Sequence, residues 1–463
     1  MADYDLIVIG SGAAGFSAAA KAKNLGVARV AVIERGTLWG TCVNYGCIPS
    51  KFLITLAELV YYKNYRHPGI AIEGSLDLPK TLAEKHALID RSLKKKYRTL
   101  IEELGVEIIA GDASFVSPHE LRVADRILTA PRFIIATGSS PSLPPVDGIE
   151  EITPMTNIEA LEPEKIPRRL IVIGGRALGL EFAQLYSHLG SKVTVLQRSP
   201  RIIPEEEPEI SDSMAGYLRA EGIDIRTGAG IRHVGNVGDS VKLLADIGGR
   251  PEEFSGDAIL FATGRSPNTK DLHLKNAGVE TLGGGAIGVD EYLQTSAPHI
   301  WAAGDVLGEP QLEPAAKVGG SLAAENAVTG TKRRFNKREI PHAIFTTPQV
   351  ASVGMTEDEA RRAGIRVTTR CTKMDAIARS AILGDIRGMV KIVAEEKSGR
   401  ILGVHICAPL ASEMIQEGVI AVKLGLTVRD IMETFHIFPA MTEILWVCAR
   451  SFGHGHDAEC GTM

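Results

Sequence analysis

Two copies of one local pattern constrain the fold of this chain more than any other feature. The apolar run 6–9 leads into Gly10-Ser11-Gly12-Ala13-Ala14-Gly15, and the run 170–173 leads into Gly174-Gly175-Arg176-Ala177-Leu178-Gly179. Each turn is followed by a segment with helical character. Glycines in such a turn let the backbone approach a pyrophosphate at the helix N-terminus. The sequence therefore predicts an α/β protein with two Rossmann-like dinucleotide-binding domains.

The first copy contains every part of the dinucleotide-binding fingerprint. A second apolar run, 30–33, ends at Glu34, and this acid can accept hydrogen bonds from ribose hydroxyls. A lone glycine motif would be weak support, but here a strand precedes it and a helix follows it. We therefore predict cofactor contacts at Gly10, Gly12, Gly15 and Glu34.

The second copy departs from this fingerprint in two ways. Arg176 occupies the middle glycine position, so that Gly174 and Gly179 remain as the predicted cofactor glycines. The strand that follows ends in Gln197-Arg198 instead of an acid, and the missing carboxylate removes repulsion of a ribose 2′-phosphate. Arg198 and Arg201 are therefore predicted to bind that phosphate. This pattern favours NADPH, leaves NADH possible, and has the alternative that both arginines are merely exposed.

The stretch from Gly40 to Lys51 holds two cysteines, Cys42 and Cys47, separated by four residues. Pro49 suits the first turn of a helix, so we expect a loop that turns into a helix near Cys47, and a helix N-terminus favours the thiolate. The pair could alternate between a disulfide and a dithiol. A structural disulfide and half of a zinc site are the alternatives, and these residues alone leave the choice open.

Composition excludes several classes of partner. The 463 residues include 51 Lys and Arg against 56 Asp and Glu, a formal net charge of −5, which gives no reason to expect nucleic acid or an anionic membrane. The apolar runs have the length of strands, and residues 1–5 do not begin a signal peptide. A cytoplasmic protein is therefore expected.

The remaining chain suggests four parts. Ala136-Thr137-Gly138 and Ala303-Gly304-Asp305 follow apolar runs, and Asp305 can accept from sugar or ribityl hydroxyls. From Pro341 strands and helices alternate as in a separate α+β domain. The predicted division is a first dinucleotide domain at 1–147, a second at 148–268, a return segment to the first at 269–337, and a C-terminal domain at 338–463.

These motifs, in this order, resemble the pyridine nucleotide–disulfide oxidoreductases, a flavoprotein family, and the likeness runs from Tyr4 to Arg450. The resemblance implies FAD in the first unit, NADPH in the second, and a homodimer formed by the C-terminal domain. It implies that Cys47 is the thiolate beside the flavin and that Cys42 faces the substrate. Further roles implied by the resemblance are a Lys51–Glu181 ion pair near the flavin, ribityl binding by Asp305, and cofactor contacts by Thr41, Thr137 and Gly138.

One departure from the family bears on the substrate. Disulfide reductases of this family carry a His-Pro pair followed by a glutamate, and counting back from Glu443 puts Phe438 where the histidine belongs. A phenyl ring cannot deliver the proton that a departing thiolate needs, whereas a metal held by two thiolates needs no such base. The resemblance therefore implies reduction of a soft metal ion, and Hg²⁺ is the leading candidate.

Three functions thus stay in contention. The first is Hg²⁺ reduction. The second is a dihydrolipoamide- or glutathione-type disulfide reductase that uses His436 as its base. The third is a flavoprotein that binds soft metal without turnover.

The C-terminal tail adds His454, His456 and Cys460 as candidate metal ligands beside Cys42 and Cys47. Histidine and cysteine on a tail could relay a soft metal to the redox pair. The alternative is a tail with incidental histidines.

Overall fold

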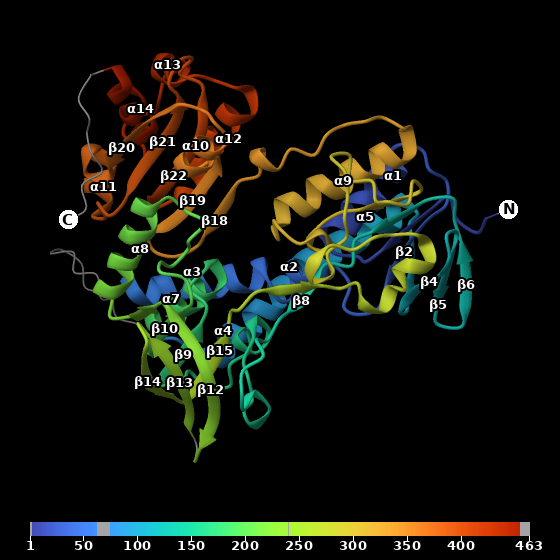
Figure 1. The fold of residues 1–463 in the computed structure, drawn as a ribbon, viewed down its shortest axis with the longest axis horizontal. Coiled ribbons are helices and arrows are strands. Elements are labelled where there is room, and N and C mark those ends of the chain that lie inside the picture. Colours follow the sequence, from blue (N-terminus) through green and yellow to red (C-terminus); the bar gives the residue numbers. More distant parts are fainter. Residues whose placement is uncertain (1, 63–74, 239, 454–463) are drawn as a thin grey trace. The chain divides into compact units, whose positions relative to one another are not determined.

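The computed structural model describes residues 2–62, 75–238 and 240–453 (Figure 1). The chain forms two compact units. The first comprises Met1–Leu53, Asp77–Leu143 and Thr263–Lys337, and the second comprises Ile54–Leu76, Pro144–Ala262 and Arg338–Met463. Each unit is described by itself.

A parallel sheet in the order β17-β7-β1-β2-β3 forms the centre of the first unit. Its strands are β1 (Leu6–Ile9), β2 (Val30–Glu34), β3 (Glu107–Ala110), β7 (Phe133–Ile135) and β17 (Ile300–Ala302). Residues at alternate positions pack into two different cores, one on each face of the sheet. Because both faces are covered, β1, β2 and β7 read as unbroken apolar runs in the sequence.

Helices cover one face of this sheet and a small antiparallel sheet covers the other. On the helical face, α1 (Ala13–Asn24) packs against α9 (Glu313–Thr329), with α5 (Lys95–Leu104) nearby (Figure 1). The antiparallel sheet consists of β4 (Ala113–Ser117), β5 (Glu120–Val123) and β6 (Arg126–Thr129). The sequence suggested that the segments 106–113 and 120–132 pair with each other. That was wrong for β3, which extends the parallel sheet beside β2.

The redox stretch folds as two consecutive helices, α2 (Gly40–Asn44) and α3 (Cys47–Tyr62). The expectation of a loop before the second helix was therefore wrong for 40–44. Further elements of the first unit are α4 (Leu78–Ala87), a π-helical turn (Leu88–Lys94), and the paired strands β8 (Ser139–Pro141) and β16 (Arg265–Pro267).

The second unit contains a parallel sheet in the order β11-β10-β9-β15. An apolar core lies between it and the antiparallel sheet β12-β13-β14. The strands are β9 (Arg169–Ile173), β10 (Lys192–Gln197), β11 (Asp224–Thr227), β12 (Ala229–Val237), β13 (Ser240–Ile247), β14 (Arg250–Gly256) and β15 (Ala258–Phe261). The helices are α6 (Asn157–Ala160), α7 (Ala177–His188) and α8 (Pro208–Ala220).

The same unit contains the antiparallel sheet β18-β19-β22-β21-β20 near the C-terminus. Helices α12 and α14 pack against it, and α8 contacts β22. The strands are β18 (His342–Ile344), β19 (Gln349–Gly354), β20 (Val367–Lys373), β21 (Met389–Glu395) and β22 (Ile401–Ala408). The helices are α10 (Glu357–Arg362), α11 (Ala378–Leu383), α12 (Ala411–Leu424), α13 (Val428–Glu433) and α14 (Glu443–Arg450).

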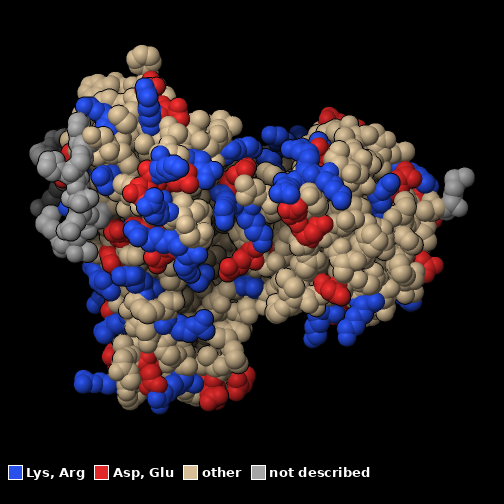
Figure 2. Space-filling model, turned by 45° about the horizontal axis from the view of Figure 1, so that its top comes forward, with Lys and Arg blue, Asp and Glu red and all other residues tan. Residues whose placement is uncertain are grey.

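The predicted fold class is confirmed, with two Rossmann-like parallel sheets and a C-terminal α+β part. The four-part domain division stays a prediction. On the face drawn in Figure 2, basic and acidic side chains lie among one another. Within the described ranges, no helix is both long enough and apolar enough to cross a membrane.

Candidate active site

The first glycine turn is shaped so that a side chain at either end of it would collide with the backbone. A Cβ on Gly10, whose φ is +105°, would lie 2.3 Å from the carbonyl oxygen of Ala136, and one on Gly15 would lie 1.8 Å from the carbonyl oxygen of Gly10. The N-cap of α1 is Gly12, so no side chain of its own caps the N–H groups of the first turn. These N–H groups suit a phosphate, and the turn therefore fits a dinucleotide.

Glu34 lies beside this turn at the end of β2. Its carboxylate accepts from the N–H of Ser11 at 2.9 Å, from the hydroxyl of Ser11 at 2.6 Å and from the N–H of Gly36 at 2.8 Å. The acid predicted to bind a ribose is thus held at the edge of the glycine turn. This position fits the role predicted for it.

The redox stretch packs directly on the same turn. A Cβ on Gly40 would lie 2.6 Å from the Cα of Gly12, and the N–H of Trp39 donates to the hydroxyl of Ser11 at 3.1 Å. The side-chain amide of Asn44 donates to the carbonyl oxygens of Leu38 and Gly40, each at 2.8 Å. Whatever binds at the glycine turn therefore lies close to the helix that carries Cys42.

The two cysteines differ in their acidity. The pKa of Cys47 is lowered by a hydrogen bond from the Cys42 thiol and by the positive charge of Lys51, although partial burial opposes this. The pKa of Cys42 is raised strongly, because its proton is shared with Cys47 and because the thiol is desolvated, with the charge of Glu313 adding to both. The arrangement therefore favours deprotonation of Cys47 before Cys42.

A chain of polar contacts links Asp305 to the redox stretch, and the sequence did not reveal it. The hydroxyl of Ser139 donates to Asp305 Oδ2 at 2.8 Å. Arg265 donates from Nε to this hydroxyl at 2.7 Å, from Nη2 to the Ser139 carbonyl oxygen at 2.6 Å, and weakly to Thr41 Oγ1 at 3.5 Å. Burial raises the pKa of Asp305, and the Arg265 charge opposes that rise. Arg265 directly follows Ala262-Thr263-Gly264, which repeats the Ala136-Thr137-Gly138 motif, and this repeat was the available signal.

Thr137 and Gly138 form part of the same polar region. The Thr137 hydroxyl donates to the carbonyl oxygen of Asn268 at 2.8 Å, and Asn268 N–H donates to the carbonyl oxygen of Gly138 at 2.9 Å. The Thr137 side chain thus holds the backbone at Asn268 in place. The cofactor contacts predicted for both residues stay predictions.

The second glycine turn repeats the geometry of the first. A Cβ on Gly174, whose φ is +111°, would lie 2.3 Å from the Ala262 carbonyl oxygen, and one on Gly179 would lie 1.8 Å from that of Gly174. Gln197 Oε1 accepts from the Gly175 N–H at 2.8 Å, the contact that Glu34 makes in the first unit. Gln197 therefore replaces the acid without its charge, and this turn also fits a dinucleotide.

The basic residues around the second turn have different environments. Arg176 is exposed, and its Nε lies 3.6 Å from Glu205 Oε2. Arg201 forms an ion pair with Asp212 at 3.1 Å, whereas Arg198 is exposed directly after β10. Arg198 is thus the better placed of the two predicted phosphate ligands.

Glu181 is buried on α7, and its Oε1 accepts from the N–H of Phe345 at 2.9 Å. Lys51 lies in the first turns of α3, where its charge lowers the pKa of Cys47. The two residues belong to different units, and their pairing stays a prediction.

Phe438 and His436, the two residues that the sequence prediction compares with the base of a disulfide reductase, differ in exposure. Phe438 is 70% exposed. His436 is nearly buried, its Nε2 lies 2.9 Å from Glu417 Oε1, and its Nδ1 lies 3.0 Å from the Thr434 carbonyl oxygen. Glu443 Oε2 is buried and has no hydrogen-bond partner among the described residues.

The tail residues His454, His456 and Cys460 lie outside the described residues. Within the described ranges, no group of three or more His, Cys, Asp and Glu side chains is placed to hold a metal ion. The predicted metal ligands therefore stay a prediction.

The parallel sheets, the two glycine turns and the cysteine pair define an oxidoreductase that binds dinucleotides. The chain belongs to the pyridine nucleotide-disulphide oxidoreductases: residues 4–320 match that family, and residues 340–448 match its dimerisation domain. FAD and NAD(P)H are the cofactors of this family, and the residues of both turns fit them. The dimerisation domain supports a homodimer.

Relatives with different names match nearly the whole chain. Mercuric reductase from Lysinibacillus sphaericus is 40% identical over 453 residues, which is 97% of this chain and 83% of the relative. Dihydrolipoyl dehydrogenase from Thermus scotoductus is 37% identical over 457 residues, 97% of this chain and 98% of the relative. The Cu(II) complex of the HOCl-induced flavoprotein disulfide reductase RclA from Escherichia coli superposes with a TM-score of 0.85 at 30% identity, covering 95% of this chain and 98% of the other.

Proposed function

We propose that this enzyme passes electrons from NADPH through FAD and the Cys42/Cys47 pair to a soft metal ion, with Hg²⁺ as the leading substrate. The observation that carries the proposal is the exposure of Phe438 together with the contacts of the nearby His436. An exposed phenyl ring stands where a disulfide reductase needs a base, and the nearby His436 is held by Glu417 and the Thr434 carbonyl. The mercuric reductase relatives support the same reading.

The cysteine pair is suited to bind a soft metal. The lowered pKa of Cys47 favours its thiolate, and a metal ion that binds Cys42 displaces the proton of that thiol, so that two sulfur ligands hold the ion. Bound FAD supplies the electron pair that it accepts as hydride from the nucleotide. Reduction of Hg²⁺ to Hg⁰ consumes these two electrons and breaks both metal–sulfur bonds. No leaving thiolate has to be protonated in this step, so the missing base does not matter.

We assign the nucleotide as NADPH. Gln197 removes the acid that would repel a 2′-phosphate, and the exposed Arg198 is next to it in the chain. Glu34 in the first turn retains its charge, as expected for the dinucleotide without a 2′-phosphate.

A second candidate, disulfide reduction, is favoured by one specific observation. Glu443 is the glutamate that accompanies the missing histidine, and its buried Oε2 has no partner among the described residues. A buried unpaired carboxylate oxygen is costly, and a histidine nearby would satisfy it. This arrangement fits a disulfide reductase whose base comes from a position other than 438, as the use of His436 would require.

Mercury-dependent NADPH oxidation in excess thiol tests the proposal. We expect rapid turnover by the wild type and a loss on the order of a hundredfold or more in Cys42→Ala, since one of two metal ligands is removed. The matched control is Cys407→Ala, because Cys407 is fully buried on β22 and is expected to keep wild-type turnover. No mercury-dependent oxidation by the wild type would refute the proposal.

Phe438→His separates the two candidates. If the enzyme is a metal reductase that lacks only a base, Phe438→His gains the ability to reduce lipoamide or glutathione disulfide. Phe438→Tyr gains no such activity. If the wild type already reduces a disulfide faster than Hg²⁺, the second candidate is correct. Stoichiometric metal binding without NADPH consumption would instead identify a non-turnover binding protein.

A further inference from the structure

A row of polar side chains crosses the C-terminal sheet inside the protein. His342, Ser352, His405 and Lys391 are direct cross-strand neighbours on β18, β19, β22 and β21. Ser352, His405 and Lys391 are each only 2% exposed. Polar groups at such positions are unfavourable unless other polar groups meet them. The row therefore requires partners from outside the sheet.

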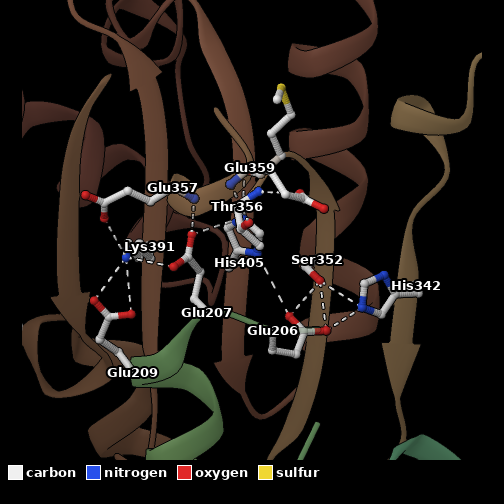
Figure 3. Close-up of polar contacts among 11 residues, drawn as sticks. Glu206, Glu207, Glu209, His342, Ser352, Thr356, Glu357, Glu359, Lys391 and His405 are labelled. Atoms are coloured by element: carbon white, nitrogen blue, oxygen red, sulfur yellow. Dashed lines mark hydrogen bonds and ion pairs between the residues drawn. The ribbon is translucent and has the colours of Figure 1, made fainter. Parts of the chain in front are cut away.

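The first partner is Glu206, which comes from the segment before α8 (Figure 3). Its carboxylate accepts from the Ser352 hydroxyl at 2.9 Å and pairs with His342 Nε2, and His405 Nδ1 lies 3.9 Å from it. Burial alone would raise the pKa of Glu206, but hydrogen bonds with His342 and His405 hold it well below its usual range. Glu206 is thus a buried carboxylate anchored to three strands.

The second set of partners surrounds Lys391. Its ammonium lies 2.9 Å from Glu207, 3.0 Å from Glu209 and 3.0 Å from Glu357. Glu207 also accepts from the Glu357 N–H at 2.6 Å. The start of α8 is therefore fixed to the sheet by charge-assisted hydrogen bonds, which are stronger than neutral ones (Figure 3).

The same segment closes over the second glycine turn. Ile203 donates its N–H to the Gly175 carbonyl oxygen at 2.8 Å, and Glu206 donates its N–H to the Ile203 carbonyl oxygen at 3.0 Å. Ile203 has a φ of +35°, which is a strained conformation for a β-branched residue. Strain of this kind persists only where the surroundings enforce it, and here the enforcing contacts are the glycine turn on one side and Glu206 on the other.

We infer that Glu206, held by His342 and Ser352, is a positioning residue for recognition of the 2′-phosphate of NADPH. It keeps the strained segment 202–207 in place, and that segment continues directly from the arginines predicted to bind the phosphate. The position of Arg201 also depends on how α8 is held against the sheet, because Asp212, the ion-pair partner of Arg201, lies on α8. The inference rests on the NADPH preference in the proposed function.

Calorimetric titration of the FAD-containing enzyme with NADP⁺ and with NAD⁺ tests the inference without any metal or turnover. Glu206→Gln keeps the size of the side chain but removes the charge that holds His342. We expect its dissociation constant for NADP⁺ to rise about tenfold or more, while that for NAD⁺ changes less than about threefold. His342 lies on the edge strand β18, and its side chain is partly exposed. His342→Ala is also expected to raise the dissociation constant for NADP⁺ more than that for NAD⁺.

Asp385→Asn is the matched control, because Asp385 is a buried partner of Arg387 in the same unit and does not contact the segment 202–207. It is expected to lower the melting temperature without changing the ratio of the two dissociation constants. If Glu206→Gln and His342→Ala both fold and keep the wild-type ratio, the inference is wrong. If the wild type itself binds NADP⁺ no more tightly than NAD⁺, the NADPH assignment fails and the inference fails with it. The metal-reduction proposal is tested separately.

Discussion

The hydrogen bond between the two cysteines yields the most direct prediction about reactivity. The pKa of Cys47 is lowered, and the first cause is a hydrogen bond with the Cys42 thiol, ahead of the charge of Lys51. A hydrogen bond to a charged group contributes about 1.5–3 kcal/mol, and about 1.4 kcal/mol corresponds to tenfold in proton affinity. Cys42→Ala should therefore increase the proton affinity of Cys47 by about ten- to a hundredfold.

The assay is the rate of iodoacetamide alkylation at Cys47 against pH, followed by mass spectrometry. The alkylation midpoint should move to higher pH in Cys42→Ala. Cys42→Ser should return it most of the way, because serine still offers an O–H donor. Lys51→Met should also raise the midpoint, by less than the loss of the hydrogen bond. Equal midpoints in Cys42→Ala and Cys42→Ser would refute the hydrogen-bond account, and would leave the helix N-terminus and Lys51 as the causes of the thiolate.

Three further predictions concern the nucleotide sites and the polar row. Arg198→Ala should raise the KM for NADPH about tenfold or more and leave that for NADH nearly unchanged, as steady-state kinetics with both nucleotides would show. Gly10→Ala should purify with little flavin, measured by the absorbance ratio, because its Cβ would lie 2.3 Å from the Ala136 carbonyl oxygen. The pKa of His342 is raised: although burial lowers it, the hydrogen bond to Glu206 and nearby acidic charge prevail. The stabilisation that protonated His342 gives to the folded state is therefore complete below pH about 6.5, and it is lost as the pH rises through the raised pKa of His342. The melting temperature should fall more steeply above that pH in wild type than in His342→Gln.

The parts of the account that the sequence predicted are those set by short spacing along the chain. The glycine turns, the acid at Glu34 and the uncharged Gln197 follow strands and helices at fixed distances, so the pattern determines their geometry. Residues far apart in sequence could not be paired in this way. Glu206 meets His342 across 136 residues, and Lys391 meets Glu207 across 184 residues. The run 205–207 alone looks like a solvated acidic surface, because nothing local shows that a polar row lies opposite it.

The region around Phe438 shows the same limit. The count back from Glu443 predicts that the base is missing, and the sequence allows this prediction because the spacing is local. The contacts that hold His436 could not be read in the sequence, since Glu417 lies on α12, whereas His436 lies in the loop after α13. The buried, unpaired oxygen of Glu443 also depends on packing that the sequence does not reveal.

The central claim is that the Cys42/Cys47 pair delivers electrons to a soft metal. Its most direct test is anaerobic stopped-flow mixing of NADPH-reduced enzyme with Hg²⁺ in excess thiol, while flavin absorbance and released elemental mercury are measured together. The account predicts rapid flavin reoxidation with one Hg⁰ per NADPH consumed, and repeated turnover with further NADPH. Reduced flavin that persists with Hg²⁺ but is reoxidised on mixing with a disulfide would contradict it.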